Sequence, residues 1–262
     1  MEFTLNRIFD SIENHLPNTE KAFQFSKKCV YLQTDSSTPR SHLDSSLGGV
    51  PYWTAEAGEF PRNEAGEPLL LLAQINLRQV NDIKEISWDW PISGMLQYFI
   101  DSSDDAGNSY WCDFEEPCNQ KGFRIVYHEQ IDENAPVFAP ILDFEYGDMS
   151  PLTNSAEWRR ISFVLGESYP EVGSLECDAL ESADSLPEDY DERDIPAGHK
   201  LWGFPNFTQS DPRTSEEYEL LFQLDTDENV MFGDTGIANF FIKPEDLRQR
   251  DFSRVWYNWD CC

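Results

Sequence analysis

Two pairs of polar residues lie at the ends of apolar runs and are the strongest candidates for a functional site. Gln74 and Asn76 end one run, and Gln223 and Asp225 hold the same places in a second. An amide inside an apolar strand is costly unless it is hydrogen-bonded. The two glutamines either bond across a pseudo-symmetric core or line a shared ligand cleft. The candidates for the rim of such a cleft are Asp211, Arg213, Asp227 and Asp234.

An oxygen-rich loop begins at Asp225. Asp225, Asp227 and Asn229 match the first three ligand positions of an EF-hand calcium loop, but the required later Gly and Glu are missing. Two interpretations stay open. The loop is either a cation site of another type, using Asp225, Asp227 and Asp234, or a β-turn whose Asp side chains bond local amides.

Sequence motifs of known catalytic and nucleotide-binding sites are absent. G-x-S-x-G, H-E-x-x-H, the P-loop and G-x-G-x-x-G do not occur. Cys112 and Cys118 have acidic neighbours that would raise a thiol pKa, so neither is favoured as a nucleophile. A metal or acid–base pair of His42 and His199 is less favoured than two unrelated histidines. We predict no cofactor. Whether catalysis occurs stays open, because glycosidases need a pair of carboxylates and the sequence cannot show such a pairing.

The elements that must position these residues are mostly strands. Aromatic residues make up 14% of the chain, and 16 Pro and 14 Gly indicate many turns. An apolar face from Leu5 to Leu16 predicts an N-terminal helix that ends before Pro17. We therefore predict an α+β fold, predominantly antiparallel β-sheet with an N-terminal helix, in a single domain over residues 1–262.

The last third of the chain resembles the first. The matching segments are Leu71–Asn76 with Leu220–Asp225 and Gly94–Ile100 with Gly236–Ile242. Trp53 and Trp202 each lie 21 residues before the glutamine of their segment. We predict an internal duplication of a strand unit, with pseudo-repeats over about 29–128 and 196–262. The alternative is chance, because strand–turn–strand units are generic.

The charge of the chain restricts its partners. The formal net charge is −30, with 49 Asp and Glu against 19 Lys and Arg. Such a charge repels nucleic acid and anionic membranes, since binding phosphates needs clustered cations. It favours a basic protein partner, and the alternative is that it serves solubility alone. An acidic stretch over 181–194 is either a solvated loop or a docking loop.

The cysteines and the N-terminus indicate a compartment. Six cysteines occur without a C-x-x-C pair, and the sequence does not begin with a secretory signal or contain a long apolar span. We therefore expect reduced thiols, no membrane association and a cytoplasmic location. The oligomeric state stays open.

Several segments resemble the bacterial YwqG-like family. The segments are 46–52, 72–76, 94–100, 199–205, 209–213, 220–225, 233–236 and 240–242, which follow one another in order along nearly the whole chain. One departure is Phe232, where the resemblance leads us to expect Trp before Gly233-Asp234. The family is one of unknown function, and some of its members look like parts of toxin and immunity systems.

These observations lead to two functional hypotheses of different classes. The first is a non-enzymatic, acidic, cytosolic binding protein, of the immunity type against a basic toxin. The alternative is a hydrolase or a small-ligand or cation binder, with its site at the junction of the two halves.

Overall fold

A single antiparallel sheet organises the chain. The computed structural model describes residues 25–35, 41–83, 93–103, 112–138, 150–153, 158–182, 190, 197–215 and 217–262. The strands are β1 (Lys27–Asp35), β2 (Ser46–Leu47), β3 (Leu70–Asn76), β4 (Met95–Ile100), β5 (Phe123–His128), β6 (Arg159–Ser168), β7 (Lys200–Leu201), β8 (Glu219–Leu224), β9 (Ile237–Ile242) and β10 (Trp256–Asp260). Their order in the ten-stranded sheet is β10-β9-β8-β7-β1-β6-β2-β3-β4-β5.

Helices are few and short, so the predicted α+β class is wrong and the described chain is mostly β. Within the described residues, the α-helices are α3 (Leu77–Asn81), α4 (Leu175–Ser182) and α5 (Pro244–Gln249), and a 3-10 turn covers Ala55–Ala57. The predicted class depended on a helix over the N-terminal apolar pattern, Leu5 to Leu16. That predicted helix lies outside the described residues. No helix in the described ranges is long and apolar enough to cross a membrane.

The sheet is symmetric in its strand order. Each half of the chain contributes five strands, β1 to β5 and β6 to β10, and the two first strands are exchanged. β1 lies between β6 and β7, while β6 lies between β1 and β2. The centre of the sheet is therefore built from both halves.

The pairing registers of the two halves agree. Gln74 faces Gln97 on the neighbouring strand, and Gln223 faces Asn239. A bulge interrupts both strand pairs at the same place. It begins three residues before the glutamine in each pair, at Leu71 before Gln74 and at Leu220 before Gln223. The registers place the segments matched by sequence at equivalent positions. Descent from a duplication, and the repeat limits 29–128 and 196–262, stay predictions.

The predicted equivalence of Trp202 and Trp53 is wrong. Ser46 pairs with Gln74 and Lys200 pairs with Gln223, which makes Trp202 the counterpart of Gly48. Both of these residues have positive φ, 62° for Trp202 and 60° for Gly48. The loop after β7 is five residues shorter than the loop after β2. Trp53 and Trp202 lie equally far before their glutamines, and this equal spacing led to the wrong alignment of the two loops.

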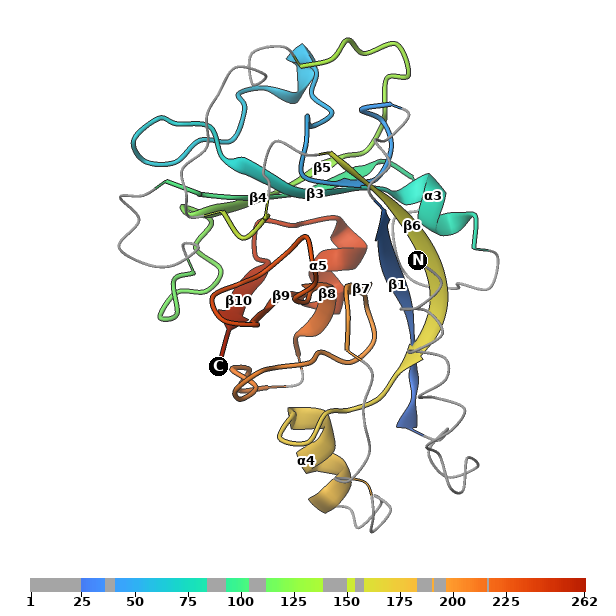
Figure 1. Cartoon of the computed structure of the whole chain (residues 1–262), viewed down its shortest axis with the longest axis vertical. Helices are drawn as coiled ribbons and strands as arrows, with labels where there is room; N and C mark the ends of the chain where they lie inside the picture. The colour runs from blue at the N-terminus through green and yellow to red at the C-terminus, as the bar shows by residue number, and fades with distance from the viewer. Residues whose placement is uncertain are drawn as a thin grey trace.

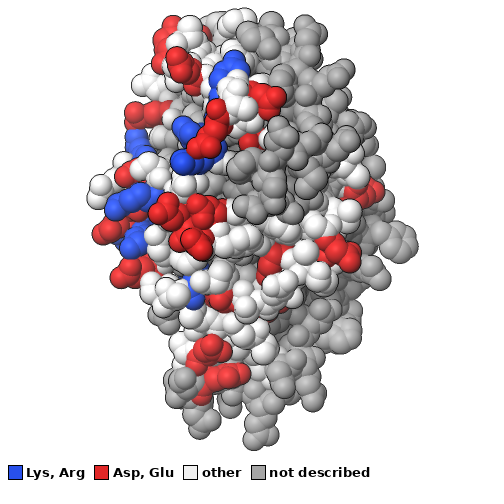
Figure 2. All heavy atoms as spheres, turned by 90° about the vertical axis from the view of Figure 1, so that its left-hand side faces the viewer, with Lys and Arg blue, Asp and Glu red and all other residues white. Residues whose placement is uncertain are grey.

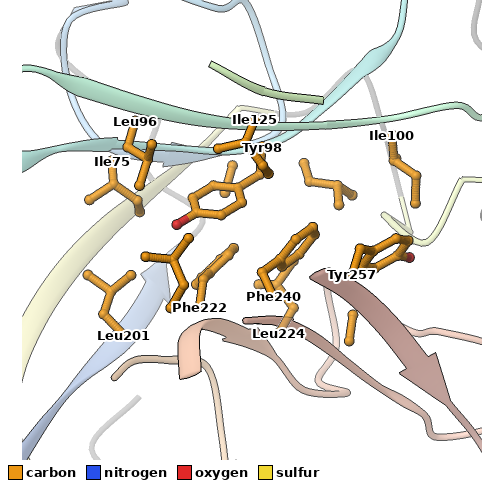
Figure 3. Packing of buried hydrophobic residues seen from close by; sticks show 14 of the residues in the cluster. Ile75, Leu96, Tyr98, Ile100, Ile125, Leu201, Phe222, Leu224, Phe240 and Tyr257 are labelled. Atoms are coloured by element: carbon orange, nitrogen blue, oxygen red, sulfur yellow. The ribbon is translucent and has the colours of Figure 1, made fainter. Parts of the chain in front are cut away.

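The two ends of the sheet fold toward each other and enclose the main core. In Figure 1 the arm of β3, β4 and β5 lies across from the arm of β8, β9 and β10, as in a half-barrel. Between the arms, the Tyr98 ring centroid lies 4.4 Å from that of Phe222 and 5.1 Å from that of Phe240. Figure 3 shows these rings meeting between the two arms. Burial of aromatic rings from both arms holds them together.

The segment after residue 112 joins the two outer strands. The Tyr257 N–H of β10 donates to Pro117 O at 3.0 Å, and the Ile125 N–H of β5 donates to Gln120 Oε1 at 2.9 Å. This segment therefore satisfies backbone groups on both edge strands, which would otherwise be free to pair with other chains.

Candidate functional site

The first polar cluster lies on the N-terminal arm and consists of Tyr52, Gln74, Gln97 and His128. Gln74 Oε1 accepts the Tyr52 N–H at 2.9 Å, and its Nε2 donates to two carbonyls of the loop before β2, those of His42 and Asp44. Because the neighbouring side chains of β3 pack into the core, alternation along the strand puts Gln74 on the opposite face. The amide of Gln74 therefore fixes two loops to that face of the sheet.

His128 completes this cluster. Gln97 Nε2 donates to Tyr52 O at 2.8 Å, and Gln97 Oε1 lies 2.9 Å from His128 Nε2. An amide oxygen only accepts, so the ring must carry its proton on Nε2. Burial between the Tyr52 and Trp53 rings lowers the pKa of His128 to about 4. The imidazole is therefore neutral at physiological pH.

The second polar cluster lies at the equivalent place on the C-terminal arm and consists of Lys200, Asn206, Gln223 and Asn239, with the carboxylates Glu171 and Asp260 beside them. Gln223 Oε1 accepts the Asn206 N–H at 2.8 Å, and its Nε2 donates to Gly198 O at 2.9 Å. Asn239 Nδ2 donates to Asn206 O at 2.9 Å. These bonds repeat those of Gln74 and Gln97.

The second cluster differs from the first in its buried charge. Lys200 is 1% exposed, and its Nζ donates to Asn206 Oδ1. Burial lowers the pKa of Lys200 to about 8, against the attraction of the Cys29 thiol, Asp225 and Glu171. Burial likewise raises the pKa of Glu171, although the Phe207 N–H and Lys200 oppose the shift. A buried amine beside Glu171 and Asp225, two carboxyls whose pKa burial raises, marks this region as a candidate functional site.

His199 is fixed by two acidic residues. Its Nδ1 accepts the Asp225 N–H at 2.9 Å, so Nε2 carries the proton of the neutral ring and lies 3.2 Å from Asp227 Oδ2. This second contact is electrostatic, because Nε2 has no well-directed hydrogen bond among the described residues. The side chain of His199 is 6% exposed. Both ring nitrogens face internal groups, and the geometry favours a positioning role.

The Asp225–Asp234 loop is organised as a turn. Asp227 Oδ1 accepts the N–H groups of Asn229 and Val230 at 2.6 and 2.9 Å. Burial alone would raise the pKa of Asp227, but the His199 ring and these N–H groups outweigh it and lower the pKa to about 2. Burial raises the pKa of Asp225, and Asp234 is exposed.

The side chain of Asn76 also serves its own arm. Its Nδ2 donates to Leu43 O at 2.8 Å, and its Oδ1 accepts the Arg78 N–H at the start of α3. Its backbone N–H donates to Ser45 Oγ, as that of Asp225 donates to His199. Across the described ranges, no three His, Cys, Asp or Glu side chains gather as a metal-binding group.

Arg213 and Asp211 form a buried ionic cluster that makes no hydrogen bond to Gln74 or Gln223 within the described residues. The Arg213 guanidinium is fully buried and makes five hydrogen bonds, to Asp211, Glu176 and the carbonyl of Tyr218. Asp211 Oδ2 also accepts the Leu175 N–H at the start of α4. All donors of the guanidinium are used, so this cluster anchors α4, which stands apart from the sheet in Figure 1.

The structure thus divides the eight residues singled out by sequence. Gln223 and Asp225 lie close to Lys200, whereas Gln74 and Asn76 belong to the other arm. The two glutamines make no hydrogen bond with each other in the described chain, and each binds loops of its own arm. Sequence reasoning missed Lys200, Glu171 and Asp260. The one available signal was the charge of Lys200 inside an apolar segment.

The cysteines are unbridged, as expected. All six are free, with Cys29, Cys112 and Cys177 buried. Burial is the main reason that the pKa of Cys112 rises to about 12, with Asp113 adding to it. The thiol of Cys112 donates to Tyr257 O at 3.3 Å, a packing role rather than a nucleophilic one.

Comparison with known proteins places the fold in a family without assigning it an activity. The comparison with curated proteins gives no match. Residues 45–261 match a family described as a domain of unknown function, DUF1963, and this range contains both polar clusters and nine of the ten strands. The chain therefore belongs to the DUF1963 family.

Proposed function

We propose that this protein is a non-catalytic binding protein that docks a basic protein partner on its acidic surface, of the immunity type against a basic toxin. One observation carries the proposal. Phe114 is 64% exposed, the largest exposed fraction among the large hydrophobic side chains described, and it stands in the acidic sequence Asp113-Phe114-Glu115-Glu116. An exposed aromatic ring within a rim of like charges is the chemistry of an interface anchor.

The turn that carries Phe114 is built before any partner arrives. Asp113 Oδ1 accepts the N–H groups of Glu115 and Glu116 at 3.1 and 2.9 Å, and the Asn119 N–H donates to Glu116 O at 2.7 Å. The Glu116 N–H is the main cause that lowers the pKa of Asp113, so this carboxylate stays ionised. A rigid turn reduces the ordering cost of binding.

The surrounding surface adds long-range attraction. Several surface cations are paired with acids, as in Arg78–Glu133, Lys121–Glu64 and Lys243–Glu217. On the face shown in Figure 2, Lys and Arg atoms lie beside Asp and Glu, and further acidic groups extend beyond them. With a net charge of −30, the unpaired acids attract a basic partner and speed its association.

The test is affinity capture from lysate of the native cells at about 50 mM salt, with a matched wash at about 500 mM. Retained proteins are identified by mass spectrometry, and the candidate is then produced alone to measure its binding kinetics and its toxicity with and without this protein. We expect a basic protein that high salt releases. Phe114→Ala should raise Kd by about tenfold or more, through faster dissociation.

Matched variants distinguish the contribution of the Phe114 turn to binding from the contribution of net charge alone. Glu115→Gln/Glu116→Gln and Glu56→Gln/Glu59→Gln each change the net charge from −30 to −28. Only the first pair should slow association strongly, and Val172→Ala, at a side chain that is 50% exposed, should leave Kd unchanged. Binding that is indifferent to salt and to Phe114→Ala would rule this function out.

The finer family assignment is also a proposal. Membership of the YwqG-like group within the family rests on the ordered segments described above, and the bacterial and cytoplasmic setting follows from that resemblance and from the unbridged cysteines.

A further inference from the structure

The two polar clusters share one hydrogen-bond plan but differ in how completely it is satisfied. In the N-terminal cluster, Gln97 uses both ends of its amide, giving Nε2 to Tyr52 O and Oε1 to His128. The register makes Asn239 the counterpart of Gln97 and Asp260 the counterpart of His128. The C-terminal cluster therefore has a side chain one methylene shorter and a carboxylate in place of the imidazole donor.

Asn239 is left with an unused acceptor. Its Nδ2 faces Asn206 O, because a carbonyl needs a donor. By analogy with Gln97, whose Oε1 faces His128 on β5, we place Asn239 Oδ1 toward β10. The residue is completely buried, and Oδ1 has no hydrogen-bond partner within the described residues. A buried amide oxygen left unpaired destabilises the folded state, so a donor or cation at this point would be strongly favoured.

Two further oxygens nearby share this condition. Asp260 Oδ2 accepts the N–H groups of Thr208 and Gln209 at 3.1 and 2.8 Å, whereas Asp260 Oδ1 and Thr208 Oγ1 are buried and find no partner in the described chain. Asp260 lies on the same face of the sheet as Asn239, two positions along the ladder, where His128 reaches Gln97 in the other arm. The pairing of β9 with β10 and the bond between Thr208 and Asp260 thus bring a buried amide, carboxylate and hydroxyl oxygen to the same part of the fold.

The charge nearby sets the kind of ligand. Glu171 lies close enough to Asp260 and Lys200 to interact with both charges. Asp260 and Glu171 against Lys200 leave a single negative charge, Asp225 also acts on Lys200, and the Lys200 ammonium would repel a divalent ion. Hard oxygen ligands select hard cations, and calcium would need more carboxylates than this.

We propose that Asn239 Oδ1, Asp260 Oδ1 and Thr208 Oγ1 form a binding site for a small monovalent cation, such as K⁺, Na⁺ or ammonium. The cation faces Asn239 Oδ1 in the place where the neutral His128 ring donates its Nε2–H to Gln97 Oε1 in the other arm. It ties β9 and β10 to the loop after β7, and so stabilises the acidic C-terminal arm.

The test compares thermal unfolding of the full chain in KCl, NaCl, NH₄Cl and choline chloride, each at about 0.2 M, where screening of surface charge is equal. Choline is too large to enter a buried site. At roughly ten times its Kd, a bound cation should raise the Tm by about 3–5 °C over choline. Equal Tm values in all four salts would overturn the proposal.

Two variants locate the effect. Asp260→Asn keeps an oxygen for Thr208 and Gln209 and places an N–H where Oδ1 was, and Asn239→Gln/Asp260→His copies the N-terminal cluster. Either should lose the difference between small cations and choline, with circular dichroism confirming the fold. Gln97→Asn makes the same one-methylene change in the other arm and should keep the difference. A cation effect that persists in both C-terminal variants would place it elsewhere and sink the proposal.

Discussion

At the scale of single residues, position in the fold decides protonation, as His128 shows. Burial lowers its pKa to about 4, well below the ordinary value of about 6.5. Between these two values the unfolded chain binds a proton that the folded protein does not. The folded state therefore loses stability as the pH falls through this window.

We predict that His128→Gln weakens the pH dependence of stability. Between about pH 7.5 and about pH 4.5, the histidine should account for a loss of about 2 kcal/mol in the free energy of unfolding. Urea unfolding of both proteins at the two pH values measures this. An identical loss in the variant would show that His128 is not the titrating group.

Tyr98 gives a second prediction at this scale. Its side chain is fully buried in the core between the arms, and its hydroxyl has no hydrogen-bond partner within the described residues. Tyr98→Phe removes an unpaired polar group, so it should be neutral or raise the free energy of unfolding by up to about 1.5 kcal/mol.

The matched control is Tyr52→Phe. The Tyr52 hydroxyl accepts the Asp132 N–H at 2.9 Å, so this variant should lose about 0.5–1.5 kcal/mol. Urea unfolding compares the two. A clear destabilisation by Tyr98→Phe would mean that its hydroxyl is bonded after all.

At the scale of elements, the turns after β2 and β7 depend on a glycine at equivalent places. Gly49 and Gly203 have φ of 78° and 79°, and a Cβ at either would overlap a neighbouring side chain, Trp158 for the first and Ser168 for the second. These turns deliver Tyr52 and Asn206 to the glutamines of their arms. Backbone conformation thus sets the geometry of both polar clusters.

Gly203→Ala should therefore lower the free energy of unfolding by about 2–4 kcal/mol, from backbone strain and overlap together. Gly66 has φ of 86° with nothing within 4 Å of its Cβ position, so Gly66→Ala reports the backbone cost alone, about 1 kcal/mol. Chemical denaturation measures both. Equal losses would mean that the close packing at Gly203 relaxes freely.

At the scale of the whole molecule, the exchanged first strands join the two halves into one cooperative unit. β1 bonds to β7 and β6 bonds to β2, so neither arm can open fully without exposing the other's edge. The aromatic contact between Tyr98 and Phe240 links the arms again across the core.

We predict a single opening free energy for both arms. Hydrogen exchange of the amides of β4 and β9 should give equal protection, and Phe240→Ala should lower both by about 3–5 kcal/mol. Loss of protection in β9 alone would show that the arms unfold independently.

The sequence by itself determined the local content of this protein. Residue type and spacing alone predict the strands around Gln74 and Gln223, the turn around Asp227 and the excess of acids. These features depend only on composition and on neighbours along the chain. The matched segments of the two arms were visible for the same reason. The weight given to the N-terminal apolar pattern led to the wrong fold class, since such a pattern says little about how the remainder packs.

Only the tertiary structure decided which polar groups meet. Lys200, Glu171 and Asp260 come from β7, the chain after β6 and β10, and only the folded chain brings these three separate segments together. Arg213 is a candidate ligand-binding residue by sequence, but its guanidinium is instead paired with Asp211 and Glu176 inside the fold. Burial and orientation set whether a polar side chain is satisfied or left with an unused oxygen, as at Asn239, and neither property is local in the sequence.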